Sequence, residues 1–129
     1  MNKVQKQMLE VLEETKNFYS QDTSRRATQQ TSSGLVCNYQ TPNGNRCGVS
    51  RYLKDGFLEA HPEVVEDNPR ASALISEYGA PMKLLNEYPN FWGMIQSFHD
   101  CRYNWDGEGL TERGEVKYRL IKQRIITVM

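Results

Sequence analysis

The chain has 129 residues, about one domain's worth of protein, and its 16 basic residues balance its 16 acidic residues. Zero net charge argues against a general nucleic-acid or anionic-membrane binder, because both need a cationic excess. No long apolar run is present, so the sequence predicts no membrane contact through a spanning segment. Three cysteines in a chain with no signal-peptide pattern indicate free thiols in a reducing cytoplasm.

The N-terminal third divides into a helix and a polar segment. Residues 1–19 carry apolar side chains at helical spacing, with Glu, Lys and Gln between them, which predicts an amphipathic helix. Residues 20–34 contain nothing larger than Ala27 to bury. Such a segment does not offset the entropy cost of its own ordering, so we expect a mobile loop there.

Residues 35–49 have the pattern of an antiparallel β-hairpin. Pro42 can preset the first turn dihedral and Gly44 can supply a positive φ. Counted outward from this turn, Cys37 falls opposite Cys47, within side-chain reach on one face. The pair could form a disulfide, hold a metal or pack as two small apolar groups.

The next segments are predicted to be helical. Ser50 is expected to cap a short helix, and Asn68 with Pro69 to start another that Gly79 ends. Residues 81–88 suggest a further short helix, and the spacing from Pro89 predicts one that carries His99.

The C-terminal part is read as a turn-rich loop followed by a helix. Residues 104–109 form the loop, and residues 111–129 form the last helix. The apolar positions expected to face inward in that helix are Val116, Leu120, Ile121, Ile125 and Val128. The fold class is therefore α+β, a mostly helical single domain over residues 1–129 with one small hairpin.

The charges are unevenly distributed. Residues 53–79 hold two basic against six acidic residues, and residues 110–129 hold five basic against two acidic residues. We interpret these blocks as solvated helix faces, with a surface for a partner protein as the alternative.

Zinc is the first candidate chemistry, because Cys37, Cys47, His99 and Cys101 supply thiolate and imidazole donors. Their spacing matches no familiar zinc motif, and His99 and Cys101 could share a metal only if the helix ended at His99. A cysteine nucleophile with His99 or His61 as base and Asp100 as orienting group is a weaker alternative. The sequence favours cysteines that only pack.

A ligand-binding site is the second candidate. Four arginines near the hairpin could hold a phosphate, and Tyr39 or Trp105 could stack on a base. The candidate ligand-binding residues are Arg25, Arg26, Tyr39, Arg46, Arg51, His99, Asp100 and Trp105.

Three blocks of the chain resemble a family of small proteins from tailed phages and prophages. The blocks are Cys37-x-Tyr39 with Gly44-x-x-Cys47-Gly48-Val49-Ser50-Arg51, then Ile95-Gln96-x-x-His99-Asp100, then Asn104-Trp105 with Gly109-Leu110-Thr111. The chain departs from the family pattern where Gly48 replaces Ala and Ser50 replaces Gly. The resemblance implies a viral origin and a hairpin, and it implies no activity.

From this resemblance we expect a phage-encoded accessory protein of the host cytoplasm that binds and inhibits a host protein, with antiviral defence as one candidate target. The first alternative is a pocket protein that sequesters or cleaves a nucleotide-like signal. The second is a small structural zinc module. No cofactor other than zinc is expected, and the sequence does not decide whether the protein is an enzyme.

Overall fold

The computed structural model describes residues 1–31, 34–41 and 44–127, with the backbone alone at residues 28–31, 34–37 and 102. The chain forms two compact units: residues 1–25 together with 97–129, and residues 26–96. Each unit is described by itself. The prediction of a single domain stays a prediction.

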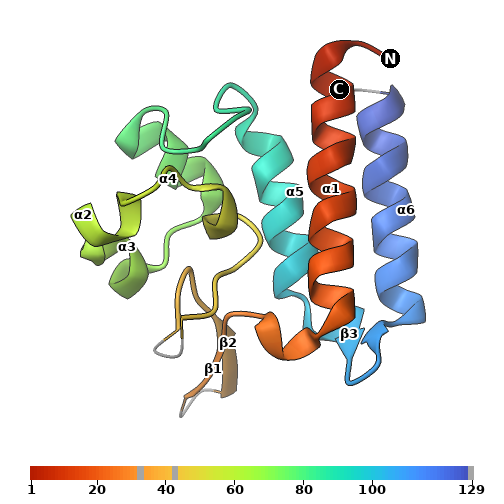
Figure 1. Ribbon diagram of the computed structural model, residues 1–129, viewed down its shortest axis with the longest axis horizontal. Coiled ribbons are helices and arrows are strands. Elements are labelled where there is room, and N and C mark those ends of the chain that lie inside the picture. The colour runs from red at the N-terminus through yellow and green to blue at the C-terminus, as the bar shows by residue number, and fades with distance from the viewer. Residues whose placement is uncertain (32–33, 42–43, 128–129) are drawn as a thin grey trace. The chain divides into compact units, whose positions relative to one another are not determined.

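The first unit is built on two long helices. Its elements are α1 (Lys3–Gln21), the 3-10 turns η1 (Thr23–Arg25) and η3 (Arg102–Asn104), the strands β3 (Trp105–Asp106) and β4 (Gly109–Leu110), and α6 (Glu112–Thr127). Figure 1 shows α1 and α6 side by side, and the start of α1 meets the end of α6, where Gln5 Nε2 donates to the Ile125 carbonyl at 3.1 Å.

Helix α1 is confirmed where its periodicity placed it. Asn2 and Gln5 form a capping box, in which each side chain accepts from the other residue's backbone N–H. The buried face carries Met8, Val11, Leu12, Thr15 and Tyr19. These residues follow the helical spacing seen in the sequence.

Helix α6 is confirmed, but its orientation differs from the prediction. Its buried residues are Gly114, Tyr118, Ile121 and Ile125. The inward positions expected at Val116 and Leu120 are wrong, because these side chains are 46% and 62% exposed. The expectation for Val128 lies outside the described residues.

A hairpin that the sequence did not predict joins α5 and α6 in the first unit. Trp105 pairs with Leu110 and Asp106 with Gly109, so the expected loop contains two short strands. Gly109 has a φ of +124°, and a Cβ there would lie 3.0 Å from the Ser20 carbonyl oxygen. Glycine is required here because both the dihedral and the close approach exclude a side chain.

The second unit consists of short helices and one hairpin. Its elements are β1 (Thr28–Thr31), β2 (Gly34–Cys37), the 3-10 turn η2 (Ser50–Tyr52), α2 (Phe57–Ala60), α3 (Pro62–Asp67), α4 (Ala71–Tyr78) and most of α5 (Pro89–Asp100), which ends in the first unit. Gly79 ends α4 with a φ of +64°, as its position in the sequence indicated.

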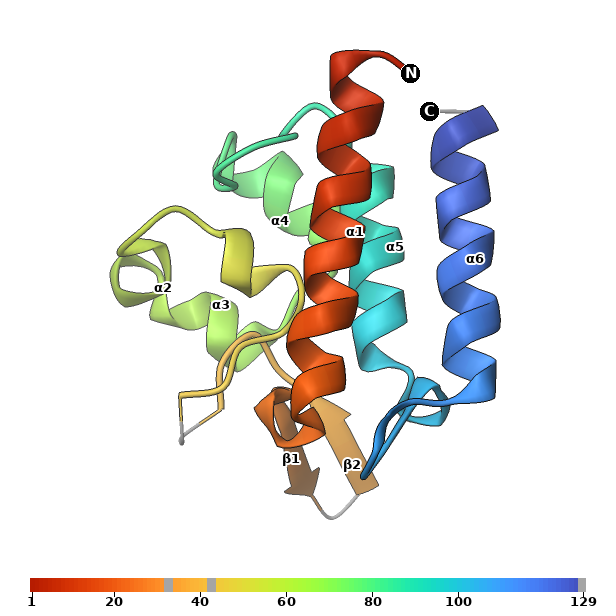
Figure 2. The same cartoon turned by 45° about the vertical axis from the view of Figure 1, so that its right-hand side comes forward.

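The hairpin of the second unit is formed by β1 and β2, and not by the two strands predicted within residues 35–49. Figure 2 shows β1 beside β2, and their register places Cys37 opposite Thr28. A bridge between Gln40 and Arg46 closes the turn that contains Gly44, and the Gly44 φ of +88° agrees with the prediction. Cys37 therefore does not pair with Cys47, and β1 lies in the segment expected to be a loop. Pro42 lies outside the described residues.

Three local predictions for the second unit are wrong. Asn68 is the left-handed C-cap of α3 with a φ of 49°, and Arg70 takes the N-cap position of α4. Residues 81–88 form turns around a bridge between Met82 and Leu53. Val49 is the N-cap of η2, so Ser50 is its first residue.

The fold class is nevertheless confirmed as α+β and mostly helical, with small antiparallel sheets. In the part of the chain that the structure describes, every helix is too short or too polar to cross a membrane.

Candidate functional site

The pair His99–Asp100 ends α5 and belongs to the first unit. His99 is fully buried, and its Nδ1 lies 2.7 Å from Asp100 Oδ1, whose side chain is 36% exposed. The imidazole packs edge-on against Tyr19, with ring centres 4.8 Å apart. Because the imidazole ring has no solvent-exposed surface, it is a packed side chain, and the partly exposed Asp100 carboxylate orients it.

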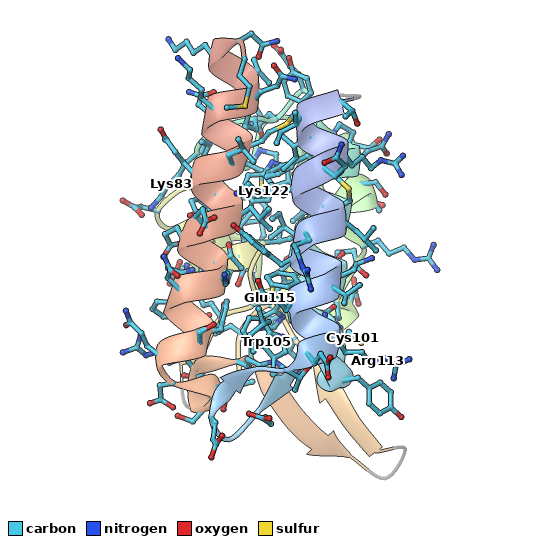
Figure 3. All side chains as sticks on the ribbon, turned by 90° about the vertical axis from the view of Figure 1, so that its right-hand side faces the viewer. Lys83, Cys101, Trp105, Arg113, Glu115 and Lys122 are labelled. Carbon is cyan, nitrogen blue, oxygen red and sulfur yellow. The ribbon has the colours of Figure 1, made fainter. Side chains whose placement is uncertain are left out.

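Trp105 extends the same packed cluster. Its ring lies 5.9 Å from that of Tyr19 and 5.2 Å from that of Phe98. Its indole N–H donates to the Phe98 carbonyl at 3.2 Å, and that oxygen also accepts from Asn104 Nδ2 at 2.9 Å. These bonds fix the turn after α5. Trp105 is therefore held by its neighbours rather than presented for stacking on a ligand (Figure 3).

In the second unit, Tyr39 is likewise a buried aromatic side chain held by hydrogen bonds. It is fully buried, its hydroxyl donates to the Pro69 carbonyl at 2.5 Å, and it accepts from Gln96 Nε2 at 3.2 Å. Gln96 Oε1 in turn accepts the Ala71 backbone N–H at 3.0 Å. This network connects the segment after the hairpin to α4 and α5.

The predicted arginines have separate surroundings. Arg25 stacks on Phe18, and Arg46 approaches Glu59 with an N–O distance of 3.6 Å. Arg51 lies over the Tyr52 ring, and Arg26 is nearly buried. Of the eight candidate ligand-binding residues, Arg25, His99, Asp100 and Trp105 lie in the first unit and the others in the second. The ligand site stays a prediction.

The candidate zinc ligands are likewise divided. Cys47 is buried in the second unit, where its Sγ accepts the Ser50 backbone N–H at 3.3 Å. His99 and the exposed Cys101 belong to the first unit. Helix α5 ends at Asp100, and the side chain of Cys37 is outside the described residues. Among the side chains that are described, no group of three or more donors could hold a metal.

A surface cluster in the second unit was missed by sequence reasoning. The rings of Phe57, His61 and Tyr78 lie 4.7 to 5.3 Å from one another. Glu63 accepts from the Tyr78 hydroxyl at 2.9 Å, and its Oε1 lies 3.3 Å from His61 Nδ1. A hydrogen bond from its own backbone and the one from Tyr78 lower the pKa of Glu63, and the latter raises the pKa of Tyr78. The only sign of this cluster in the sequence was the close spacing of His61 and Glu63.

The outer face of α1 carries an open depression of about 540 Å³. Leu9 and Phe18 border it, and Glu10, Glu13 and Glu14 lie between them. We call these five residues the acidic face of α1. Apolar and carboxylate groups together suit recognition of a protein surface that is apolar and cationic.

Comparison with family models gives a partial match. Residues 4–54 match the model described as RNA polymerase Rpb2, domain 3. The matched segment is less than half of the chain, and it begins in the first unit and ends in the second. No curated protein and no solved structure matches the chain.

This match corrects the expectation of a phage family. The matched residues include the Cys37–Arg51 block, one of the three blocks on which the resemblance rested. The viral origin and the role as an inhibitor of a host antiviral protein are therefore wrong, because the family that matches is a domain of a cellular RNA polymerase subunit. A host protein as the specific partner loses its support for the same reason.

Proposed function

We propose that this chain is a protein-binding component that acts together with an RNA polymerase. The observation that carries the proposal is the match of residues 4–54 to the model of Rpb2, domain 3. The match contains all of α1 except its first residue, and α1 carries the acidic face. The matched segment presents carboxylate and apolar groups on one outward surface, which suits contact with another protein.

The chemistry of α1 indicates the kind of contact. Glu10 and Glu13 form no ion pair within the described part of the chain, so their carboxylates are available to a cationic partner surface. Leu9 and Phe18 at the borders offer apolar contact area. Charges at the rim of an interface act mainly on association rate and specificity, and the apolar groups supply affinity.

The test is binding to a purified RNA polymerase that contains an Rpb2-type subunit, measured by biolayer interferometry. The variant Glu10→Arg/Glu13→Arg should bind at least about tenfold more weakly than the wild type. The matched control is Glu77→Arg/Glu87→Arg, which makes the same change in net charge on the second unit. Absence of wild-type binding, or equal loss in both variants, would refute the proposal.

A further inference from the structure

The outer face of α6 carries exposed aliphatic side chains among its polar ones. Val116 and Leu120 are 46% and 62% exposed and stand one helical turn apart. They lie opposite the face that Tyr118, Ile121 and Ile125 bury. Figure 3 shows this helix beside α1 with many of its side chains directed away from the unit. Two neighbouring exposed aliphatic side chains on one face suggest a contact surface.

Four cationic side chains lie around this apolar pair, together with the exposed Glu112 one turn before Val116. The four cations are Arg113, Lys117, Arg119 and Arg124, and with Val116 and Leu120 they form what we call the basic face of α6. Arg113 also stacks over Tyr103, which is itself half exposed, with 5.1 Å to the ring centre. An apolar pair between cations requires a partner with apolar and acidic groups.

The acidic face of α1 has that composition, and its spacing matches. Glu10, Glu14 and Phe18 follow one another at intervals of four residues, as do Val116, Leu120 and Arg124. Two such rows have the same length, roughly 12 Å at the rise of an α-helix. Laid antiparallel, they place Phe18 against Val116, Glu14 beside Leu120 and Glu10 against Arg124.

These two faces cannot meet within one molecule. Helix α1 packs in the first unit through Met8, Leu12 and Tyr19, and α6 through Tyr118 and Ile125, so each of the two faces points away from its own core. The partner that carries both required groups is another copy of this chain. Zero net charge removes the long-range repulsion that would otherwise keep copies apart.

We propose that the basic face of α6 binds the acidic face of α1 in a second copy of the chain. The contact is heterologous, because each copy uses a different face. A pair therefore retains one free α1 face and one free α6 face, and the assembly grows with protein concentration. The inference does not depend on binding to a polymerase.

Sedimentation equilibrium of the full chain tests this association. The weight-average mass should rise with concentration at low salt and fall toward the monomer at about 1 M salt, where the screening length is about 3 Å. Leu120→Ser should abolish the rise. Ile126→Ser is the matched control, since Ile126 is 42% exposed on the same helix but outside the basic face. Circular dichroism checks that both variants are folded.

Charge reversal gives the decisive experiment. Arg113→Glu/Arg124→Glu and Glu10→Arg/Glu13→Arg should each be monomeric alone. The first variant has a native acidic α1 face and an α6 face that has become acidic. The second variant has a native basic α6 face and an α1 face that has become basic. An equimolar mixture should therefore associate through the two reversed faces or through the two native ones, with a mass above that of the monomer.

The outcomes separate this inference from the proposed function. A wild-type chain that stays monomeric at every concentration, or a mixture of the two variants that stays monomeric, would overturn self-association. The α6 variant Arg113→Glu/Arg124→Glu should retain its binding to RNA polymerase while losing self-association. If polymerase binding fails in the wild type while the mass still rises with concentration, the proposed function is wrong and the self-association stands.

Discussion

Gly114 is the position in the first unit where a single methyl group should be most disruptive. A Cβ at this residue would lie 2.3 Å from the Asn104 carbonyl oxygen and 2.5 Å from Leu110 Cδ1. The same Asn104 oxygen accepts the Thr111 N–H at 2.8 Å, and Thr111 Oγ1 accepts the Gly114 N–H at 3.0 Å. Alanine at position 114 would therefore push the Asn104 carbonyl away from the start of α6 and strain these two hydrogen bonds.

The size of the effect follows from what must move. An ordinary contact of a Cβ is longer than about 3.4 Å, so the Asn104 carbonyl has to shift by about 1 Å. That atom belongs to the backbone, and no change of rotamer relieves the clash. Overpacking of this kind costs about 1–3 kcal/mol, while alanine in a helix recovers up to about 1 kcal/mol. We expect Gly114→Ala to lower the free energy of unfolding by about 2 kcal/mol.

Urea denaturation followed by circular dichroism measures this change. The matched control is Gly93→Ala in the interior of α5, where a Cβ meets no described atom within 4 Å. Gly93→Ala should raise the free energy of unfolding by about 0.5–1 kcal/mol. If Gly114→Ala is as stable as the wild type, the close approach of η3 to α6 is absent in the protein and the reasoning fails.

Two further outcomes follow from the titratable groups. In Tyr78→Phe the pKa of Glu63, followed by NMR titration, should rise toward its ordinary value of 4.5, because a hydrogen bond that lowers it is lost. The lowered pKa stabilises the wild type above pH 4.5 and this contribution disappears as the pH falls through the folded-state pKa, so the variant should lose less stability on acidification. His99→Ala should lower the free energy of unfolding by about 2–4 kcal/mol, because a fully buried ring is removed, whereas His61→Ala at a 38% exposed side chain should cost about 1 kcal/mol or less. Equal effects at the two histidines would contradict the packed role of His99.

The longest helices were the most predictable part of this fold. Helix α1 repeats its apolar side chains over five turns, and α5 does so from Pro89 to His99. A pattern of that length constrains both the type of element and its buried face. Gly79 and Gly44 were placed correctly because each supplies a positive φ that other residues rarely adopt.

Short elements were harder to predict because local signals compete there. Asn68 before Pro69 has the chemistry of a helix start, yet asparagine also tolerates the left-handed conformation that ends α3. The sequence of β1 is polar throughout, so it has no alternating apolar pattern that would have predicted a strand paired with β2. The register of Cys37 could not be inferred while its strand partner was read as a loop.

The candidate site could be predicted only as a set of residue types. His99, Trp105 and Tyr39 have groups that bind ligands in other settings, and each is buried here with hydrogen bonds or ring contacts to its own unit. Sequence shows which groups are present, whereas burial depends on contacts between distant segments. The acidic face of α1 was visible only as the polar side of an amphipathic helix.

The orientation of α6 shows how one glycine decides between two helix faces. Gly114, Tyr118, Ile121 and Ile125 follow one helical row, and Val116 with Leu120 begins another. Hydrophobicity alone assigns both rows to the core, because glycine adds nothing to an apolar count. Yet only the row with Gly114 allows the Asn104 carbonyl to approach the helix axis, since any other residue there would collide with it. The packing of η3 therefore buries the Gly114 row and leaves Val116 and Leu120 outside, which creates the apolar surface on which the proposed self-association depends.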